Sequence, residues 1–278
     1  MWRCGVWAIV VLVGVPIPGW ATFERIPCDA ESGGVADAGT ARETQFGRSF
    51  GNPAHLARAL RCPLRITAAR LYGMESLGWR SLWGGRRFGW GTVGAGAAQF
   101  GEAGYRELTL SASLGMARGA VAYGIRARGL VLQIGHVGTR AGGVVDLGLL
   151  ARMNGRFTLG FLVSGLGPVG SGLEDTLPGP RIGLGGSMSG PGGAVAVLDV
   201  EQEPGRPRRI RFGVEVPARR GILLRAGRST EPGELSGGLG VRVHGIGVDV
   251  AVHWHSVLGF SERVSVLLRC GASSVERR

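Results

Sequence analysis

The chain has 278 residues, 52 of them glycine, and a formal net charge of +12, which suits one large domain or two small ones. All 32 basic residues are arginine, and this excludes functions that require a lysine, such as a P-loop phosphate site or a Schiff base. The arginines are spread along the chain instead of gathering beside aromatic residues, so they indicate codon bias and we expect no nucleic-acid partner.

The first 21 residues have the composition of a secretory signal peptide. Arg3 supplies the positive start, residues 5–15 form an unbroken apolar run, and Gly19 and Ala21 put small residues at the two specificity positions. The alternative is a membrane-anchor helix, but such a helix needs about 20 apolar residues. We therefore expect export with cleavage after Ala21.

Residues 22–64 form a segment without strand alternation. Asn52 is expected to cap a short helix or helical turn that begins at Pro53, because asparagine is favoured at the N-cap and proline at the first helical position. Three cysteines follow the cleavage site, and the first two, Cys28 and Cys62, flank this segment. Whether they form a disulfide in an oxidising compartment stays open.

From residue 65 to residue 270 apolar and polar residues alternate with a period of two, which is the strongest structural signal in the chain. One segment has its apolar side chains at Ile246, Val248, Val250, Val252 and Trp254. Another has them at Val145, Leu147, Leu149, Ala151 and Met153, with Leu150 as an exception. Each segment is about ten residues long and ends at a turn signal. We predict about 12–14 antiparallel strands over residues 65–270, followed by a polar tail at residues 271–278.

These strands predict an all-β, up-and-down transmembrane barrel, and the alternative is an exported, soluble β-sandwich. Soluble strands are typically about 5–6 residues long, shorter than the segments of this chain. The polar face consists mainly of Gly, Ser, Thr, Arg and acids, as a wet barrel lumen requires. The longest connections are predicted between Leu166 and Pro180 and between Gln202 and Arg208, and one rim of a barrel normally carries the longer loops.

Strand parity predicts a set of charged and polar side chains that face the lumen. Its members are Arg152, Arg209, Arg211, Glu215, Arg242, Asp249, His253 and His255. An arginine that faces lipid at the membrane midplane costs about 2–4 kcal/mol, so the inward orientation is favoured. One hypothesis is a lumen that attracts anions. The alternative is that these arginines pair with acids, among them Asp146 and Asp199, and fill a closed barrel.

We predict no enzyme activity, cofactor or metal site. His253, His255 and Ser256 lie in the one stretch that resembles a catalytic group, but the two histidines share a strand face and the serine points to the other. The histidine pair would need further ligands to hold a metal, and no third ligand has a fixed spacing to it. We therefore expect His253 and His255 to be polar lumen residues.

The run Gly51-Asn52-Pro53-Ala54 resembles the Asn-Pro-Ala motif that precedes the barrel in FadL-like fatty-acid transporters and in the related PorV and PorQ outer-membrane proteins. The order of signal peptide, small-residue segment, motif and strands is similar as well. The resemblance implies a fourteen-stranded barrel whose N-terminal segment, residues 22–64, forms a hatch in the lumen. It also implies that Asn52, Pro53 and Ala54 hold a plug turn.

The resemblance further implies an outer-membrane protein that transports hydrophobic or amphipathic small molecules, with outer-membrane lipid and such cargo as its partners. The PorV side of the resemblance implies an alternative, a non-conducting barrel that serves as an anchor or as a partner of secretion-system proteins. An exported β-sandwich with a binding role is the third possibility. A closed, plugged lumen would favour the anchor, whereas a lateral opening beside a kinked strand would favour transport.

Overall fold

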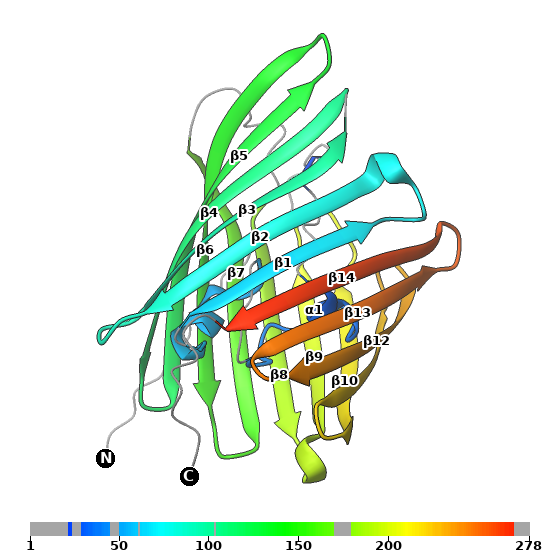
Figure 1. Ribbon diagram of the computed structural model, residues 1–278. Coiled ribbons are helices and arrows are strands. Elements are labelled where there is room, and N and C mark those ends of the chain that lie inside the picture. Colours follow the sequence, from blue (N-terminus) through cyan, green and yellow to red (C-terminus); the bar gives the residue numbers. More distant parts are fainter. Residues whose placement is uncertain are drawn as a thin grey trace.

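The computed structural model describes residues 22–23, 29–44, 50–60, 62–102, 104–169 and 179–269. The predicted signal peptide, Cys28, Cys270 and the predicted polar tail therefore lie outside the described residues. Among the residues that are described, fourteen antiparallel strands close into one barrel (Figure 1). The strands are β1 (Pro63–Arg70), β2 (Gly78–Arg87), β3 (Thr92–Glu102), β4 (Tyr105–Arg118), β5 (Val121–Ile134), β6 (Gly138–Arg152), β7 (Phe157–Val169), β8 (Arg181–Ser189), β9 (Val195–Gln202), β10 (Arg209–Arg219), β11 (Ile222–Ser229), β12 (Glu234–Val243), β13 (Ile246–His255) and β14 (Gly259–Arg269).

The barrel closes between its first and last strands. Each strand pairs with its neighbours in sequence, and β1 pairs with β14 from Pro63 opposite Arg269 to Arg70 opposite Glu262. The predicted up-and-down antiparallel barrel is confirmed. The β-sandwich alternative is wrong, because the described strands form one continuous sheet.

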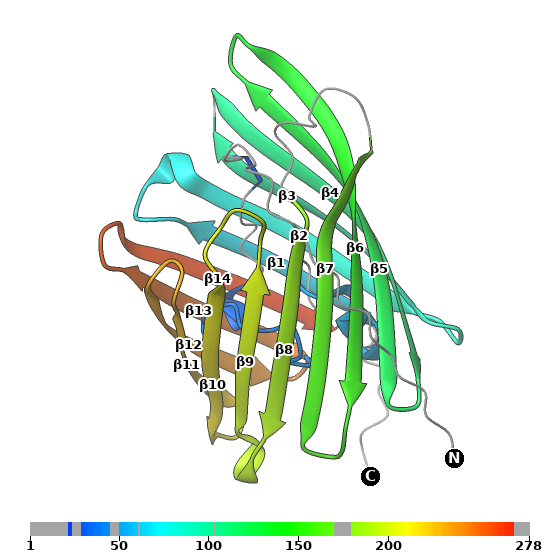
Figure 2. The ribbon, with the colours of Figure 1, turned by 180° about the vertical axis from the view of Figure 1, so that it is seen from behind.

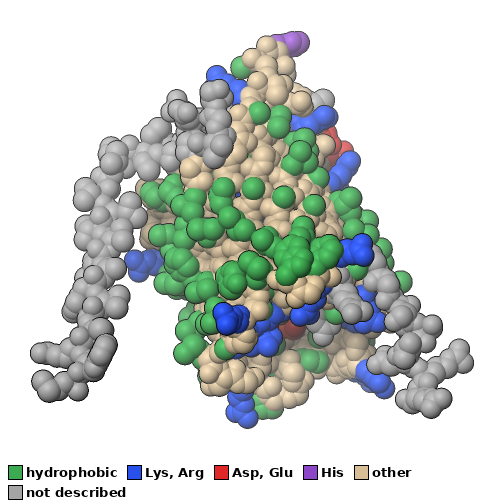
Figure 3. Space-filling model, turned by 90° about the vertical axis from the view of Figure 1, so that its left-hand side faces the viewer, with side chains coloured by type: hydrophobic (Ala, Val, Ile, Leu, Met, Phe, Trp, Pro, Cys, Tyr) green, Lys and Arg blue, Asp and Glu red, His purple; other side chains and the backbone are tan. Residues whose placement is uncertain are grey.

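The alternation of the sequence gives the barrel an apolar outer wall. On β13, Val248, Val250 and Val252 are exposed, while Asp249, Ala251 and His253, which alternate with them, are buried inside. Figure 3 shows apolar side chains gathered in a band across one face of the wall, with arginine side chains above and below it. No helix within the described ranges is long and apolar enough to cross a membrane.

The two ends of the barrel differ. We call the end with the β1–β2, β3–β4, β5–β6, β7–β8, β9–β10, β11–β12 and β13–β14 connections the loop rim, and the opposite end the turn rim. Both of the connections predicted to be longest, after Leu166 and after Gln202, belong to the loop rim. Strands β4 to β7 have 13 to 15 residues, whereas β8 to β14 have 8 to 11. The wall is therefore tallest along β4 to β7 (Figures 1 and 2).

Two of the short helices lie inside the barrel. The helix α1 (Ala30–Gly33) contacts β12, β13 and β14, and the 3-10 helix η1 (Pro53–Arg58) contacts β3 to β6. Two further 3-10 turns, η2 (Glu75–Leu77) and η3 (Pro191–Gly193), connect strands at the rims. The predicted helical turn at Pro53 is confirmed, and Asn52 caps it by accepting a hydrogen bond from the Ala54 N–H at 3.0 Å.

Candidate functional site

The described residues 29–44 and 50–60, here called the lumen segment, lie within the barrel (Figure 1). Asn52 joins this segment to itself and to the wall. Its amide Nδ2 lies 2.9 Å from the Thr40 carbonyl oxygen, 3.2 Å from that of Leu149 and 3.1 Å from that of Phe161. A single buried side chain thus connects the lumen segment to strands β6 and β7.

Pro53 and Ala54 fit against glycines of the wall. A Cβ atom at Gly148 would overlap the Asn52 side chain, and one at Gly124 would overlap the Pro53 backbone. Ala54 is fully buried and packs against Leu150. Leu150 was the exception in the predicted alternation of its strand. Strand parity points it inward, and the lumen segment supplies an apolar surface for it there.

Ion pairs hold the α1 end of the lumen segment. Arg65 of β1 forms ion pairs with Asp29 and, at 2.8 Å, with Glu31. Arg42 of the segment lies 3.2 Å from Glu31 and 2.5 Å from Glu215 of β10. Because these side chains are buried, removing one partner would leave a charge without compensation in the barrel interior.

The same network continues across the wall. Arg225 of β11 donates to Glu215 at 2.5 Å and to Asp249 at 2.7 Å, and Arg242 of β12 donates to Asp249 at 2.9 Å. Arg225 and Asp249 have fully buried side chains. The charges of four strands, β10 to β13, and of the lumen segment therefore compensate one another.

Glu31 is the acid at the centre of this network. Burial tends to raise the pKa of its carboxyl, but Arg42 and Arg65 outweigh burial and hold that pKa well below the ordinary value for glutamate. Glu31 is therefore a carboxylate at neutral pH. Its charge ties α1 to β1 and to the following stretch of the lumen segment.

Backbone groups of the lumen segment find their partners on the wall. Asp199 of β9 accepts hydrogen bonds from the Gly39 N–H at 2.6 Å and from the Thr40 N–H at 2.8 Å. Arg263 of β14 donates to both carboxylate oxygens of Asp37, at 2.7 and 3.0 Å. The segment is thus bonded to two wall strands that are not neighbours, β9 and β14.

The predicted lumen residues have several different environments. Arg209 and Arg211 both bind Glu201, at 2.9 and 3.1 Å. Glu215, Arg242 and Asp249 belong to the buried network described above. For these five residues the contacts favour the pairing alternative over the hypothesis of an anion-attracting lumen.

The other three predicted residues lie elsewhere. His253 is buried, with Nδ1 3.8 Å from a Glu234 carboxylate oxygen. The ring of His255 accepts hydrogen bonds from the Val257 and Leu258 N–H groups in a turn at the loop rim. Arg152 is half exposed at the turn rim, where it pairs with Glu43. Within the described residues, no group of three or more His, Cys, Asp or Glu side chains is arranged to hold a metal ion.

Sequence reasoning named Asp146 as an acid that pairs with lumen arginines but missed Arg126 and Arg128, with which it forms a second buried charge cluster. Asp146 of β6 accepts hydrogen bonds from Arg126 Nε at 2.7 Å and from Arg128 Nε at 2.8 Å. It also accepts the Gly165 N–H of β7 at 2.9 Å. Arg126 and Arg128 stand at alternate positions of a predicted strand, as lumen residues should, and that spacing was a usable signal.

The sequence reading also missed an apolar area on the inner wall. Leu130, Leu132 and Val144, here called the apolar lumen patch, are buried together with Phe23. A second apolar cluster joins Trp79, Ala69 and Ala98 of the inner wall to Phe50 of the lumen segment. Both lie nearer the loop rim than η1, since Leu130 and Leu132 are close to the loop-rim end of β5 and Trp79 is at that end of β2. The sequence predicted a polar lumen face, whereas the lumen has apolar areas as well.

Strand β7 is irregular beside this area. Its register with β6 shifts twice, between the pairs Gly143–Val169, Val145–Leu166 and Leu147–Val163. Its pairing with β8 ends at Ser164 opposite Arg181. Figure 2 shows β7 continuing beside β6 past the start of β8. Backbone groups of residues 165–169 thus have strand partners on one side, within the part of the chain that the structure describes.

No protein-family model matches the chain, and no curated protein matches it by sequence. Solved structures match its fold. The toluene transporter TbuX of Ralstonia pickettii gives a TM-score of 0.59 at 12% identity, over 85% of this chain and 96% of that one. The monoaromatic hydrocarbon channel CymD gives 0.59 and 12% over 90% and 97%, and the toluene transporter TodX of P. putida gives 0.53 and 11% over 78% and 90%.

These similarities concern the fold. The fourteen-stranded barrel implied by the FadL-like resemblance is confirmed, and the three similar structures are named as transporters or channels. The PorV and PorQ side of the resemblance stays a prediction.

Proposed function

We propose that this chain is an outer-membrane barrel that conducts hydrophobic or amphipathic small molecules. The observation that carries the proposal is the apolar lumen patch. Leu130, Leu132 and Val144 give the interior of a closed barrel a surface that water does not favour and that an apolar molecule does. Barrels of similar fold that are named as toluene transporters and hydrocarbon channels support this class of cargo.

The outer wall supports the membrane location. Exposed apolar side chains cover it, and at the turn rim the rings of Phe88 and Trp90 stack with centroids 5.5 Å apart. Aromatic side chains at the rim of a barrel are typical of the membrane interface. We infer delivery to the outer membrane through the predicted signal peptide, cleaved after Ala21.

The lumen segment is inferred to act as the plug of this barrel, with Asn52, Pro53 and Ala54 as the turn that holds it. Asn52 bonds to two wall strands. Pro53 and Ala54 lie so close to Gly124 and Gly148 that neither position has room for a side chain. Cargo bound at the apolar lumen patch would lie between the loop rim and this turn. Passage then requires a change in the contacts of the lumen segment.

The test is uptake of radiolabelled toluene by Gram-negative cells that produce the protein. Leu130→Ser and Leu132→Ser should lower uptake, because each makes the apolar lumen patch polar. Leu267→Ser is the matched control, since Leu267 is also inward-facing and fully buried but lies on β14, away from the patch. Heat-modifiable gel mobility verifies that cells contain the same amount of folded barrel for each variant. Uptake equal to that of cells without the protein would contradict the proposal.

The second candidate is the non-conducting barrel that anchors or assists other proteins. The buried ion pairs of the lumen segment with β1, β10 and β14, and its backbone hydrogen bond to Asp199 of β9, favour it, because they make the plug costly to move. Uptake separates the two candidates. A folded, surface-located protein that takes up neither toluene nor a labelled long-chain fatty acid would favour the anchor.

A further inference from the structure

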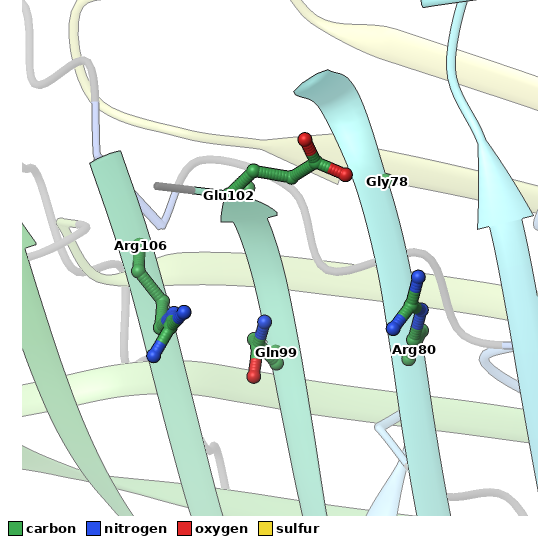
Figure 4. A pocket seen from close by; sticks show the side chains of 6 residues that line it. Gly78, Arg80, Gln99, Glu102 and Arg106 are labelled. Carbon is green, nitrogen blue, oxygen red and sulfur yellow. The ribbon is translucent and has the colours of Figure 1, made fainter. Parts of the chain in front are cut away.

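A polar pocket lies on the outer wall near the loop rim. It has a volume of about 280 Å³ and crosses β2, β3 and β4. Its lining residues are Gly78, Arg80, Gln99, Gly101, Glu102 and Arg106. Figure 4 shows Arg80, Gln99 and Arg106 on three neighbouring strands, with Glu102 above them.

The register brings the two arginines to the same outer face. Arg80 stands between Trp79 and Ser81, which are both buried inside, so Arg80 points outward. It lies opposite Gln99 of β3, and Arg106 of β4 lies opposite Gly101, two positions further along β3. The guanidinium groups therefore flank β3 from both sides.

Neither Arg80 nor Arg106 has a hydrogen bond or ion pair with another described residue. The nearby Arg70 differs, because Glu262 lies 3.3 Å from it. Glu102 contributes one negative charge to the pocket against two positive ones. The adjoining pocket, which Arg80 also lines, adds Arg70, Glu75 and Glu262, so the positive charge of the area is not in excess. What the pocket offers to a ligand on the outer wall is two guanidinium groups that no described carboxylate binds.

Directly toward the turn rim the same face becomes apolar. Leu82 is the next outward residue after Arg80 on β2, and Leu108 and then Leu110 follow Arg106 on β4. The exposed fractions of Leu82 and Leu110 are 50% and 52%. An outward arginine costs about 2–4 kcal/mol at the membrane midplane and about 0–1 near the interface. The pair Arg80 and Arg106 therefore fits the boundary between head groups and acyl chains.

We propose that Arg80 and Arg106 bind the phosphate of an anionic lipid in the leaflet at the loop rim, which is the outer leaflet if longer loops face outward. Gln99 supplies a hydrogen-bond donor between them, and the acyl chains lie along Leu82 and Leu110. Guanidinium groups match phosphate oxygens in geometry as well as charge. The inference rests on the membrane location of the proposed function and on no property of the lumen.

The experiment titrates the purified full-length protein, folded in neutral detergent micelles, with diphosphoryl lipid A and counts bound lipid by native mass spectrometry. Arg80→Gln and Arg106→Gln should each weaken binding about fivefold, and the double variant about thirtyfold. Arg118→Gln is the matched control, because Arg118 is exposed on the same face of β4 but at the turn rim, and it should bind as the unchanged protein does.

Two further arms identify the ligand. Lipid A without its phosphates should bind the unchanged protein no more tightly than diphosphoryl lipid A binds the double variant. Inorganic phosphate should displace diphosphoryl lipid A only at a far higher concentration than that of the lipid. Equal binding by the double variant and the unchanged protein would overturn the site, and so would displacement by inorganic phosphate at the lipid's own concentration. A chain that shows no heat-modifiable barrel in micelles would instead overturn the membrane location, and this site with it.

Discussion

Gly148 of β6 lies against the side chain of Asn52, so closely that a Cβ atom at position 148 would overlap Oδ1 of the asparagine. The same Oδ1 accepts the Ala54 N–H that begins η1. The turn at Asn52 can therefore form in this place only because position 148 of β6 is a glycine. A substitution at Gly148 on the wall therefore tests whether this contact fixes the position of the turn.

Gly148→Val should displace the Asn52 turn and lower the free energy of unfolding by about 1–3 kcal/mol, as overpacking typically does. Hydrogen–deuterium exchange of residues 50–60 should become faster. Gly129→Val is the control, because a Cβ at Gly129 meets no atom within 4 Å. Unchanged exchange in Gly148→Val would show that the turn does not depend on this contact.

Asp146→Ala should be among the most destabilising single changes in the wall. Asp146 is fully buried and compensates two buried arginines, Arg126 and Arg128. Breaking a buried ion pair from one side costs about 3–5 kcal/mol, because the remaining charge is left in a poorly solvated place. Urea unfolding of the micelle-bound protein, followed by tryptophan fluorescence, measures the loss.

The exposed pair of Arg70 and Glu262 provides the comparison for this prediction. Their side chains are 49% and 59% exposed, and exposed ion pairs contribute about 0–1 kcal/mol. Glu262→Gln should therefore leave the unfolding midpoint almost unchanged. Equal losses from Asp146→Ala and Glu262→Gln would mean that burial does not govern these pairs.

The pKa of Glu31 predicts how the lumen segment responds to acid. Its folded pKa is depressed by Arg42 and Arg65, despite the opposing effect of burial. Its stabilising contribution is therefore fully present above the unfolded value of about 4.3 and is lost as the pH falls through the folded pKa. The protection of residues 29–44, measured as the exchange rate relative to the intrinsic amide rate at each pH, should fall below about pH 4.

Glu31→Gln separates this effect from general acid unfolding. The variant should exchange faster than the unchanged protein at neutral pH, because it lacks the charge that pairs with Arg42 and Arg65. It should also lose the Glu31 part of the fall in protection in acid. A variant with the same pH profile as the unchanged protein would assign the acid response to other carboxyl groups.

The wall of the barrel could be predicted from the sequence because alternation is a local property. The apolar positions from Ile246 to Trp254 point outward as expected, and the turn at Pro53 begins where Asn52 and proline predict it. The long-range ion pairs could not be predicted. Arg65 and Glu31 are 34 positions apart, and their meeting depends on which strand the lumen segment follows inside a closed sheet.

The apolar lumen patch escaped prediction for another reason. Leu130, Val131 and Leu132 are apolar at consecutive positions, so that both faces of β5 are apolar near the loop rim. A reading based on period two treats such a run as noise in the alternation. Leu150 was an exception of the same kind, and in both places the extra apolar residue faces a partner inside the barrel.

Phe23 offers the most direct test of the apolar lumen patch as a cargo surface. Its side chain is buried against Leu130, Leu132 and Val144, and its N–H donates to Glu107 at 3.0 Å. Phe23 thus covers the surface that we propose for cargo, and cargo must displace it. Burying a phenylalanine side chain is worth about 1.5–3 kcal/mol, so Phe23→Ala should bind a fluorescent hydrophobic probe at least about tenfold more tightly.

Phe23→Leu is the control for this last prediction, because leucine keeps an apolar side chain over the patch and should change probe affinity little. Leu132→Ser in the Phe23→Ala background should remove the gain, since the uncovered surface is then polar. Weaker binding by Phe23→Ala would contradict the prediction. Phe23 would then be part of the binding surface itself, contributing an aromatic face to the cargo instead of competing with it.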